Sequence, residues 1–179
     1  MERGDDDLLL AQAKQGDALA FGAWIERQYD FIYRIAFRLL GNRMDAEDLT
    51  HDVCLALPDK IARYSGTGSV RGWLAQVTLN AGRDGLRRKK RRQTVDIADC
   101  AEPGHDGNAA EVLYLQEVIG VMQTLPEKSC HALLLAAEGL TQAEMALALG
   151  CAEGTVAWRV STARDELAKR LQEGKHAAR

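Results

Sequence analysis

The chain has 179 residues, of which 46% are hydrophobic, 27% are charged and 6% are aromatic. Helix-forming residues dominate it, and no run of valine, isoleucine and threonine shows the alternation of period two that marks a strand. The composition therefore predicts an all-α protein. The formal net charge of -3 would argue against a nucleic-acid partner if the charge were spread evenly along the chain.

No stretch approaches the roughly 18 to 20 consecutive apolar residues that span a bilayer. Residues 1–7 are acidic, where a secretory signal is basic. We therefore expect a cytoplasmic protein without membrane insertion. The four cysteines, Cys54, Cys100, Cys130 and Cys151, form no Cys-x-x-Cys pair and have no histidine at metal-ligand spacing. Their pattern predicts reduced thiols rather than a disulfide framework or a metal site, and a redox-sensing role for one of them stays open.

The first half of the chain carries three helical patterns. Apolar residues over 21–39 recur at intervals of three and four, as on one face of a helix, and Gly41 ends the pattern. A second helix is expected to have Asp45 as its N-cap and to end or kink at Pro58. After a polar loop that contains glycine, Ser69 can cap a third helix, which runs into a basic cluster.

Charge is segregated along this half. Residues 83–92 include seven basic side chains and one acidic one, whereas 45–52 is strongly acidic. A basic run is often only a solvated helix end. Here it follows a helix preceded by Tyr64 and Trp73, and basic residues near aromatic ones suit a surface that tracks a nucleic-acid backbone and stacks unpaired bases. Trp73 can equally belong to the core, and both interpretations stay open.

Apolar periodicity is lost over residues 93–110, where proline, glycine and acidic residues collect. We expect a flexible linker there, between one domain at 1–92 and a second at 111–179. The second domain begins with a helix that is broken near Pro126. A leucine-rich helix follows and stops at Gly139.

The sequence from Thr141 to Glu144 matches the capping-box motif, which predicts that a helix begins there. It ends at Gly150, and another helix starts near Glu153 after a short turn. This arrangement is that of a helix-turn-helix, although two helices joined by glycine can also form a plain hairpin with no nucleic-acid role. Polar groups on the second helix favour DNA binding. The face opposite the buried stripe carries Thr155, Trp158, Arg159, Ser161, Thr162 and Arg164, and together with Ala157 these are the candidate DNA-binding residues.

The two halves together resemble the extracytoplasmic-function sigma factors of the bacterial sigma-70 family. The string DAEDLTHDV and its flanks look like region two, SVRGWLAQVTLNAGRDGLRRKKRR looks like the promoter-melting and minus-10 helix, and GLTQAEMALALGCAEGTV is similar to region four. The resemblance implies an alternative sigma factor that binds core RNA polymerase and recognises the minus-35 and minus-10 elements of promoter DNA. It also implies an anti-sigma factor as a further partner, and no catalytic residue, metal ion or cofactor.

The resemblance assigns roles to particular residues. Minus-35 recognition falls to the second helix of the helix-turn-helix, and a flipped minus-10 base is expected in a pocket beneath the loop at 63–69. Polymerase docking falls to the acidic residues Asp45, Glu47, Asp48 and Asp52. Minus-10 binding falls to Arg63, Tyr64, Trp73, Asn80, Arg83, Arg87 and Arg88.

Three positions of the helix-turn-helix depart from the family's pattern. Ala157 and Trp158 stand where the family commonly has a basic residue followed by serine, so the minus-35 preference cannot be copied from relatives. Ala152 stands where a polar N-cap is expected. The recognition helix therefore begins without a side-chain cap, and its base preference is its own.

Two other functions stay open at this stage. An ordinary helix-turn-helix regulator would act without joining polymerase and would not need the acidic patch. A helical adaptor would bind proteins only. An enzyme is not expected, because the chain has no glycine-rich phosphate loop, nucleophile arrangement or metal-ligand spacing.

Overall fold

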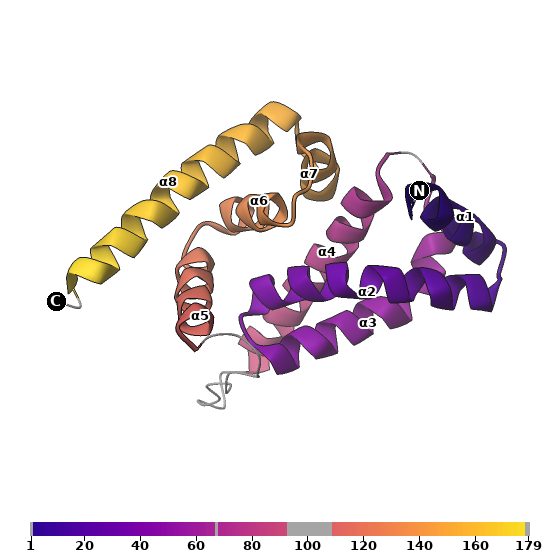
Figure 1. Cartoon of the computed structure of the whole chain (residues 1–179), viewed down its shortest axis with the longest axis horizontal. Coiled ribbons are helices and arrows are strands. Elements are labelled where there is room, and N and C mark those ends of the chain that lie inside the picture. Colours follow the sequence, from indigo (N-terminus) through magenta and orange to yellow (C-terminus); the bar gives the residue numbers. More distant parts are fainter. Residues whose placement is uncertain (1, 67, 93–108, 178–179) are drawn as a thin grey trace.

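The structure, a computed structural model, describes residues 2–66, 68–92 and 109–177. Eight helices and no strand make up these residues, which confirms the predicted all-α class (Figure 1). The helices are α1 (Glu2–Lys14), α2 (Ala18–Leu40), α3 (Arg43–Ala62), α4 (Val70–Arg92), α5 (Ala109–Gln123), α6 (Glu127–Ala137), α7 (Gln142–Leu149) and α8 (Glu153–Ala177).

Helices α1 to α4 form the first unit, with α2 at its centre. Helix α2 packs against α1, α3 and α4, and Trp24 and Ile32 on it are fully buried. Its buried residues recur at helical spacing, so the helix predicted over 21–39 is confirmed. Helix α1 was not predicted, because its leucines at 8–10 are consecutive rather than periodic. Leu10 nevertheless joins the buried core.

The turn between α2 and α3 differs in detail from the prediction. Gly41 ends α2 as expected, in the left-handed conformation with φ 78°. The N-cap of α3 is Asn42, whose side-chain oxygen accepts a hydrogen bond from the Asp45 amide at 2.8 Å. The prediction that Asp45 is the cap is therefore wrong. Asp45 lies in the first turn instead, where its negative charge favours the helix dipole.

Pro58 does not end α3, so the first of the two outcomes predicted for it, an end or a kink, is wrong. The helix continues to Ala62, and the proline itself is exposed. Its neighbours Leu57 and Ile61 are buried to 0% and 1% exposure. Burying one such side chain contributes roughly 1.5 to 3 kcal/mol, against a cost of roughly 3 kcal/mol for a proline inside a helix. The two apolar side chains together therefore hold the last turn of α3 in place.

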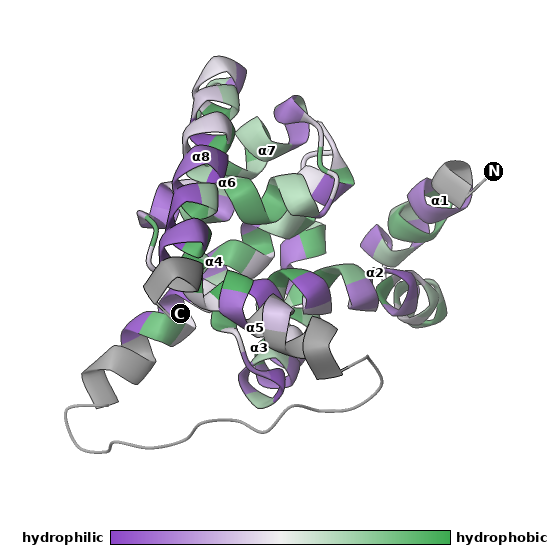
Figure 2. Ribbon diagram, turned by 60° about the vertical axis from the view of Figure 1, so that its left-hand side comes forward, coloured by the Kyte–Doolittle hydropathy of each residue, from purple (hydrophilic) through white to green (hydrophobic). Residues whose placement is uncertain are grey.

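Helices α5 to α8 form the second unit around α6, whose residues Cys130 to Leu135 are all buried. In Figure 2, α6 is mostly hydrophobic, whereas much of α8 is hydrophilic. The capping box of α7 is present as predicted, since the Glu144 amide donates to Thr141 Oγ1 and the Thr141 amide donates to Glu144 Oε2 at 2.8 Å. Gly150 ends α7 in the left-handed conformation, also as predicted.

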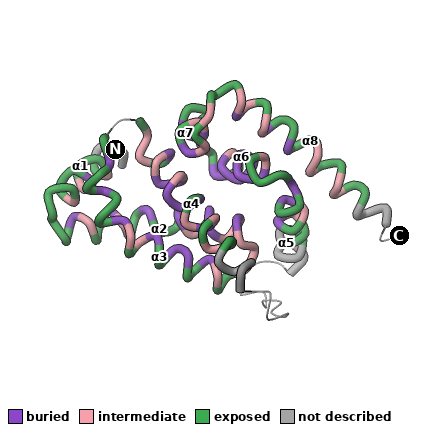
Figure 3. The backbone as a smooth tube through the Cα atoms, turned by 180° about the vertical axis from the view of Figure 1, so that it is seen from behind, coloured by how far each residue is buried: buried purple, intermediate pink, exposed green. Residues whose placement is uncertain are grey.

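The two units pack directly against each other. Helix α7 lies against α4, and α5 and α6 lie against α2, an arrangement that Figures 1 and 3 show from opposite sides. Most of the buried apolar residues of both units belong to one cluster. Figure 3 shows that the sides where the helices meet are buried, while the later turns of α8, before its grey end, are exposed or intermediate.

The predicted linker at 93–110 falls almost entirely outside the described residues, so the domain boundaries 1–92 and 111–179 stay predictions. Within the described part of the chain, no helix is both long enough and apolar enough to cross a membrane.

Candidate functional site

The acidic residues expected to dock on polymerase lie on α3, and they are of two kinds. Asp48 and Asp52 are exposed and one helical turn apart. The Glu47 carboxylate is bound by Arg43, whose Nε lies 2.7 Å from Glu47 Oε1. The Asp45 carboxylate accepts a hydrogen bond from the side-chain amide of the N-cap at 2.7 Å. Helix α3 therefore turns the carboxylates of Asp48 and Asp52 to solvent, and its first turn holds those of Asp45 and Glu47.

An apolar groove of about 540 Å³ runs between α2 and α3, and the sequence did not predict it. Leu55, on the same helix as the carboxylates, is 70% exposed beside it. A largely apolar groove with acidic residues on its walls suits the apolar face of a basic amphipathic helix. The only sequence signal for it is Leu55, an apolar residue outside the buried stripe of α3. The lining residues are Phe21, Ile25, Glu26, Tyr29, Asp30, His51, Cys54 and Leu55.

Tyr64 and Trp73 pack together between the loop at 63–69 and the first turns of α4. Their ring centroids lie 4.8 Å apart. The Tyr64 hydroxyl donates to the Gly68 carbonyl at 3.2 Å, and Lys14 Nζ donates to the Tyr64 carbonyl at 2.7 Å. Burial raises the pKa of Tyr64, and the charge of Asp7 raises it further, so the phenol stays a neutral donor. Tyr64 is buried and Trp73 is half-buried, so the indole is the ring that keeps an accessible part.

A pocket of about 300 Å³ opens beneath this loop, in the region where the extruded base was expected. Helix α1 supplies an acidic wall to it, which the sequence did not predict because it did not predict α1. The carboxylate, amide and guanidinium groups of the pocket have the chemistry to bind a base edge, whereas the one indole that lines it, that of Trp24, is fully buried. The lining residues are Asp6, Asp7, Trp24, Gln28, Gly68, Ser69, Val70 and Arg71.

The remaining minus-10 candidates lie before and along α4. Arg63, Asn80 and Arg87 are exposed. Asn80, Arg83 and Arg87 follow Trp73 at intervals of seven, three and four, which places them on one face of the helix. Arg83 is engaged by the second unit, because its Nε lies 2.7 Å from Glu127 Oε1 of α6. The side chains of Arg88 and of residues 89–92 lie outside the described part of the chain.

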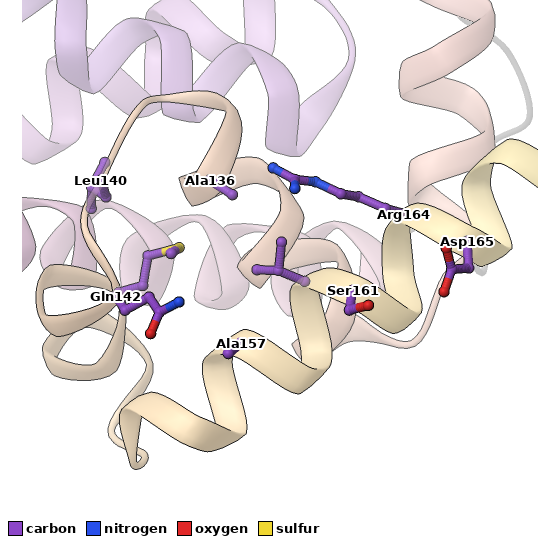
Figure 4. A pocket seen from close by; sticks show the side chains of 9 residues that line it. Ala136, Leu140, Gln142, Ala157, Ser161, Arg164 and Asp165 are labelled. Carbon is purple, nitrogen blue, oxygen red and sulfur yellow. The ribbon is translucent and has the colours of Figure 1, made fainter.

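The helix-turn-helix of α7 and α8 turns its second helix to solvent. Trp158, Ser161, Thr162 and Arg164 are exposed, and Thr155, Ala157 and Arg159 are half-buried. A hollow of about 360 Å³ lies between α6, α7 and α8. In Figure 4, Gln142 of α7 lies across this hollow from Ala157 and Ser161 of α8. The predicted minus-35 residues therefore spread over more than one side of α8.

Two details of α8 bear on base recognition. Trp158 is 65% exposed, so its indole is available to a partner. Arg159 Nη1 donates to Cys151 Sγ at 3.3 Å, which holds the guanidinium against the turn before the helix. The backbone amides of Thr155 and Val156 donate hydrogen bonds to the Ala152 carbonyl oxygen at 3.0 and 3.1 Å. Ala152 has no side-chain oxygen, so it caps the helix through its backbone alone.

Two family models match the chain in the predicted order. The model for Sigma-70 region 2 matches residues 24–92, and the model for Sigma-70, region 4 matches residues 115–167. The ECF RNA polymerase sigma factor SigM of Mycobacterium tuberculosis is 30% identical over 170 residues, which cover 95% of this chain and 86% of SigM. The chain belongs to the extracytoplasmic-function (ECF) sigma factors of the sigma-70 family.

Another relative and two solved structures agree with this assignment. The ECF sigma factor SigE of Mycolicibacterium smegmatis is 32% identical over 162 residues, and the match covers 85% of this chain but only 63% of SigE. The fold is similar to that of CnrH in complex with the cytosolic domain of CnrY, with TM-score 0.71 and 25% identity over 94% of this chain and 98% of that one. It is also similar to the sigma factor RpoE in complex with the anti-sigma factor NepR from Bartonella quintana, with TM-score 0.69 and 25% identity over 85% of this chain and 96% of that one.

The candidate surfaces of this ECF sigma factor lie in one or the other of the two matched regions. Region 2 holds the carboxylates of α3, most of the apolar groove and the Tyr64–Trp73 pair, whereas α1 precedes the match. Region 4 holds α6, α7 and the first half of α8, and so the whole helix-turn-helix.

The thiols of this ECF sigma factor are free at Cys54, Cys130 and Cys151, and Cys100 lies outside the described residues. Burial raises the pKa of Cys54. Burial, together with the charge of Glu127, raises the pKa of Cys130 to about 11. Both thiols are therefore protonated and weakly nucleophilic at neutral pH. Among the residues that the structure describes, no group of three or more His, Cys, Asp or Glu side chains is placed to hold a metal ion.

Proposed function

We propose that this ECF sigma factor binds core RNA polymerase in the cytoplasm and directs it to promoters, contacting the minus-10 element with region 2 and the minus-35 element with region 4. The observation that carries the proposal is the presence of both matched regions, in order, on one chain. An ordinary helix-turn-helix regulator has no need of the first of them. The proposed function forms no covalent bond, so it requires no catalytic residue and no cofactor.

Region 2 docks on polymerase through α3. The exposed carboxylates of Asp48 and Asp52 attract the basic clamp helices that sigma factors of this family bind, and the apolar groove beside Leu55 receives an apolar side of the same partner. Opposite charge steers the encounter, and burial of apolar surface contributes most of the affinity.

Region 2 also binds the minus-10 strand. Taking a base out of the DNA stack costs a few kcal/mol. Stacking one base on an aromatic ring returns roughly 1 to 3 kcal/mol, and phosphate contacts add to it. Trp73 supplies the ring and the pocket beneath the loop receives the extruded base. The phosphate and strand contacts come from Arg63, Tyr64, Asn80, Arg83, Arg87 and Arg88.

Region 4 reads the minus-35 element by placing α8 in the major groove, which is about 12 Å wide and admits one helix. The exposed indole of Trp158 contacts an apolar feature such as the thymine methyl group, and Arg159 and Arg164 contact phosphates or guanine. Thr155, Ala157, Ser161 and Thr162 complete the contact surface.

An anti-sigma factor is a further proposed partner. The two solved structures above hold ECF-type sigma folds in complex with CnrY and with the anti-sigma factor NepR. A protein of that class would bind this chain across regions 2 and 4 and keep it from polymerase.

Run-off transcription with reconstituted polymerase tests the proposed function. Core polymerase is incubated with the full-length chain on fragmented genomic DNA, and the 5′ ends of the transcripts are mapped. We expect new start sites that share two sequence elements upstream, and none with core polymerase alone. A chain that neither co-elutes with core polymerase nor creates a start site would overturn the proposal.

A further inference from the structure

Region 4 binds region 2 through the buried carboxylate of Glu138, the C-cap residue of α6. The Glu138 side chain is only 3% exposed, and Arg34 Nε donates to its Oε2 at 2.9 Å. Arg38 makes a second ion pair with the same carboxylate. Arg71 of α4 donates to the Glu138 backbone carbonyl at 3.2 Å. One residue of region 4 thus joins three arginines of region 2, and a buried charge of this kind is stable only while its partners stay in place.

A second carboxylate fixes α7 to the start of α4. Ser69 Oγ donates to Glu144 Oε1 at 2.6 Å, while Glu144 Oε2 closes the capping box with Thr141. The same side chain therefore begins α7 and fastens it to region 2. A third contact, between Glu127 and Arg83, lies near the surface.

The backbones of α4 and α7 approach so closely that only glycine fits between them. A Cβ atom at Gly72 would lie 2.9 Å from the Glu144 carbonyl oxygen and 3.2 Å from the Glu144 Cα atom. Both are backbone atoms, so the clash cannot be relieved by turning a side chain. Leu147 of α7 covers the same place, since its Cδ2 atom would lie 3.1 Å from that Cβ atom.

These contacts occupy groups that promoter DNA would need. Ser69 lines the pocket proposed for the extruded base, and Arg83 is a proposed strand contact. The minus-35 and minus-10 elements are centred roughly 25 base pairs apart, which is roughly 85 Å along B-form DNA. Regions that touch each other through α4 and α7 cannot reach two sites so far apart. The closed arrangement and the promoter-bound arrangement therefore exclude each other.

We infer that the free chain is held closed by a latch, formed by Glu138 with Arg34, Arg38 and Arg71, by Glu144 with Ser69, and by the close contact at Gly72, and that this latch must open before the chain binds a promoter. Glu144 binds Ser69 of the pocket proposed for the extruded base, and Glu127 binds Arg83, a proposed strand contact, so the closed chain inhibits itself. The claim that the latch prevents promoter binding rests on the proposed function. The claim that the latch holds regions 2 and 4 together does not.

The substitution Gly72→Ala tests the latch without changing any charge. Alanine is a better helix former than glycine, so α4 is not weakened, yet its Cβ atom forces α7 away. Gly120→Ala is the matched control, because a Cβ atom at that position in α5 meets nothing within 4 Å. By small-angle X-ray scattering of the full-length chain, we expect a larger radius of gyration for Gly72→Ala than for Gly120→Ala or the wild type, with unchanged helical circular dichroism.

A charge exchange gives an independent test. Glu138→Arg should expand the chain, and adding Arg34→Glu and Arg38→Glu to it should restore compaction, which mere damage to the fold would not do. The opened variants should bind a single-stranded minus-10 oligonucleotide about tenfold more tightly, if the open state is about a tenth populated in the wild type.

Equal radii of gyration for the wild type, Gly72→Ala and Glu138→Arg would overturn the latch, even if run-off transcription succeeds. Expansion of the variants without any transcription from reconstituted polymerase would instead leave the latch in place and overturn the proposed function.

Discussion

The indole of Trp73 lies against the phenol of Tyr64, with ring centroids 4.8 Å apart, and Trp73 is the less buried of the two. One face of the pair therefore belongs to the core, and the accessible part of the indole is left for a partner. The packing interpretation of Trp73 agrees with this contact, whereas stacking of a base on the accessible part of the indole stays a prediction. A substitution that removes the ring but keeps a packing side chain tests it.

Replacing the indole by an aliphatic side chain, in Trp73→Leu, removes the stacking surface and keeps much of the packing. We expect promoter opening to fall roughly 5- to 150-fold, the equivalent of the roughly 1 to 3 kcal/mol that stacking one base contributes. The lifetime and amount of open complex on a mapped promoter measure the effect.

Tyr33→Leu is the control for Trp73→Leu, because Tyr33 is a half-buried aromatic residue of α2 that stacks on Phe37. It should lower thermal stability by a similar amount and leave promoter opening unchanged once the protein is folded. If Trp73→Leu opened promoters as well as the wild type, Trp73 would have a packing role only.

Polymerase docking is tested by charge reversal on α3. Asp48→Arg puts a positive charge where basic clamp helices are proposed to bind, and we expect the affinity for core polymerase to fall at least about tenfold. Since Asp48 is exposed, the free energy of unfolding should change by no more than about 0.5 kcal/mol. Co-elution on size exclusion and a titration with labelled core polymerase measure the fall in affinity.

The same reversal on α5, Glu117→Arg, controls for the change in net charge, since Glu117 is an exposed carboxylate outside the proposed docking surface. Normal binding of core polymerase by Asp48→Arg would remove α3 as the docking site.

Trp158→Ala tests base recognition by α8. The indole is 65% exposed, so its removal should change stability by no more than about 0.5 kcal/mol. We expect a changed preference at one or two base pairs of the minus-35 element, by roughly 1 to 3 kcal/mol per base pair. Transcription from a library of minus-35 sequences measures the preference, and a library of minus-10 sequences is the control that should not change. An unchanged minus-35 profile would place Trp158 outside the contact surface.

The basic cluster at the C-terminal end of α4 makes a prediction about the salt dependence of DNA binding. When Arg87, Arg88, Lys89 and Lys90 are changed to glutamine, the slope of log affinity against log salt concentration should become shallower. The expected decrease is about 0.7 for each phosphate of a single strand that the protein no longer neutralises. Binding to a minus-10 oligonucleotide at several salt concentrations gives the slope. A slope equal to that of the wild type would mean that the cluster does not contact the backbone.

The sequence predicted those features whose partners lie close together along the chain. The capping box at Thr141 and Glu144 needs residues three apart, and the end of α2 needs only Gly41, so both predictions are confirmed. Asn42 was missed as the cap of α3 because Asp45, a good cap by residue type, competes with it three positions later.

Features that depend on distant parts of the chain could not be predicted. Pro58 was expected to end or kink α3 because proline lacks an amide hydrogen, and the apolar stripe through Leu57 did not show that Ile61 beyond it is buried as well. The contact between Ser69 and Glu144 joins residues 75 apart in sequence, and no periodicity or motif encodes it. The groove beside Leu55 likewise exists only once α2 and α3 are packed together.

The buried imidazole of His131 makes the stability of the protein depend on pH. His131 is 4% exposed in α6. Burial lowers its pKa from 6.5, an effect that Glu127 opposes and Arg83 reinforces. The unfolded chain therefore binds a proton more readily than the folded one. The free energy of unfolding should be highest above pH 6.5 and fall as the pH drops below that value, by at most about 1.4 kcal/mol per pH unit from this residue.

Denaturant titrations at pH 7.5, 6.5 and 5.5 measure this dependence, and His131→Leu should flatten it between pH 6.5 and 5.5. Glu144 does not interfere in this window. Its burial raises its pKa, but hydrogen bonds from Ser69 and Thr141 lower it by more in total, so its folded value lies below 4.5 and its contribution is lost only below that pH. Retention of the full wild-type slope by His131→Leu would show that another group is protonated on unfolding.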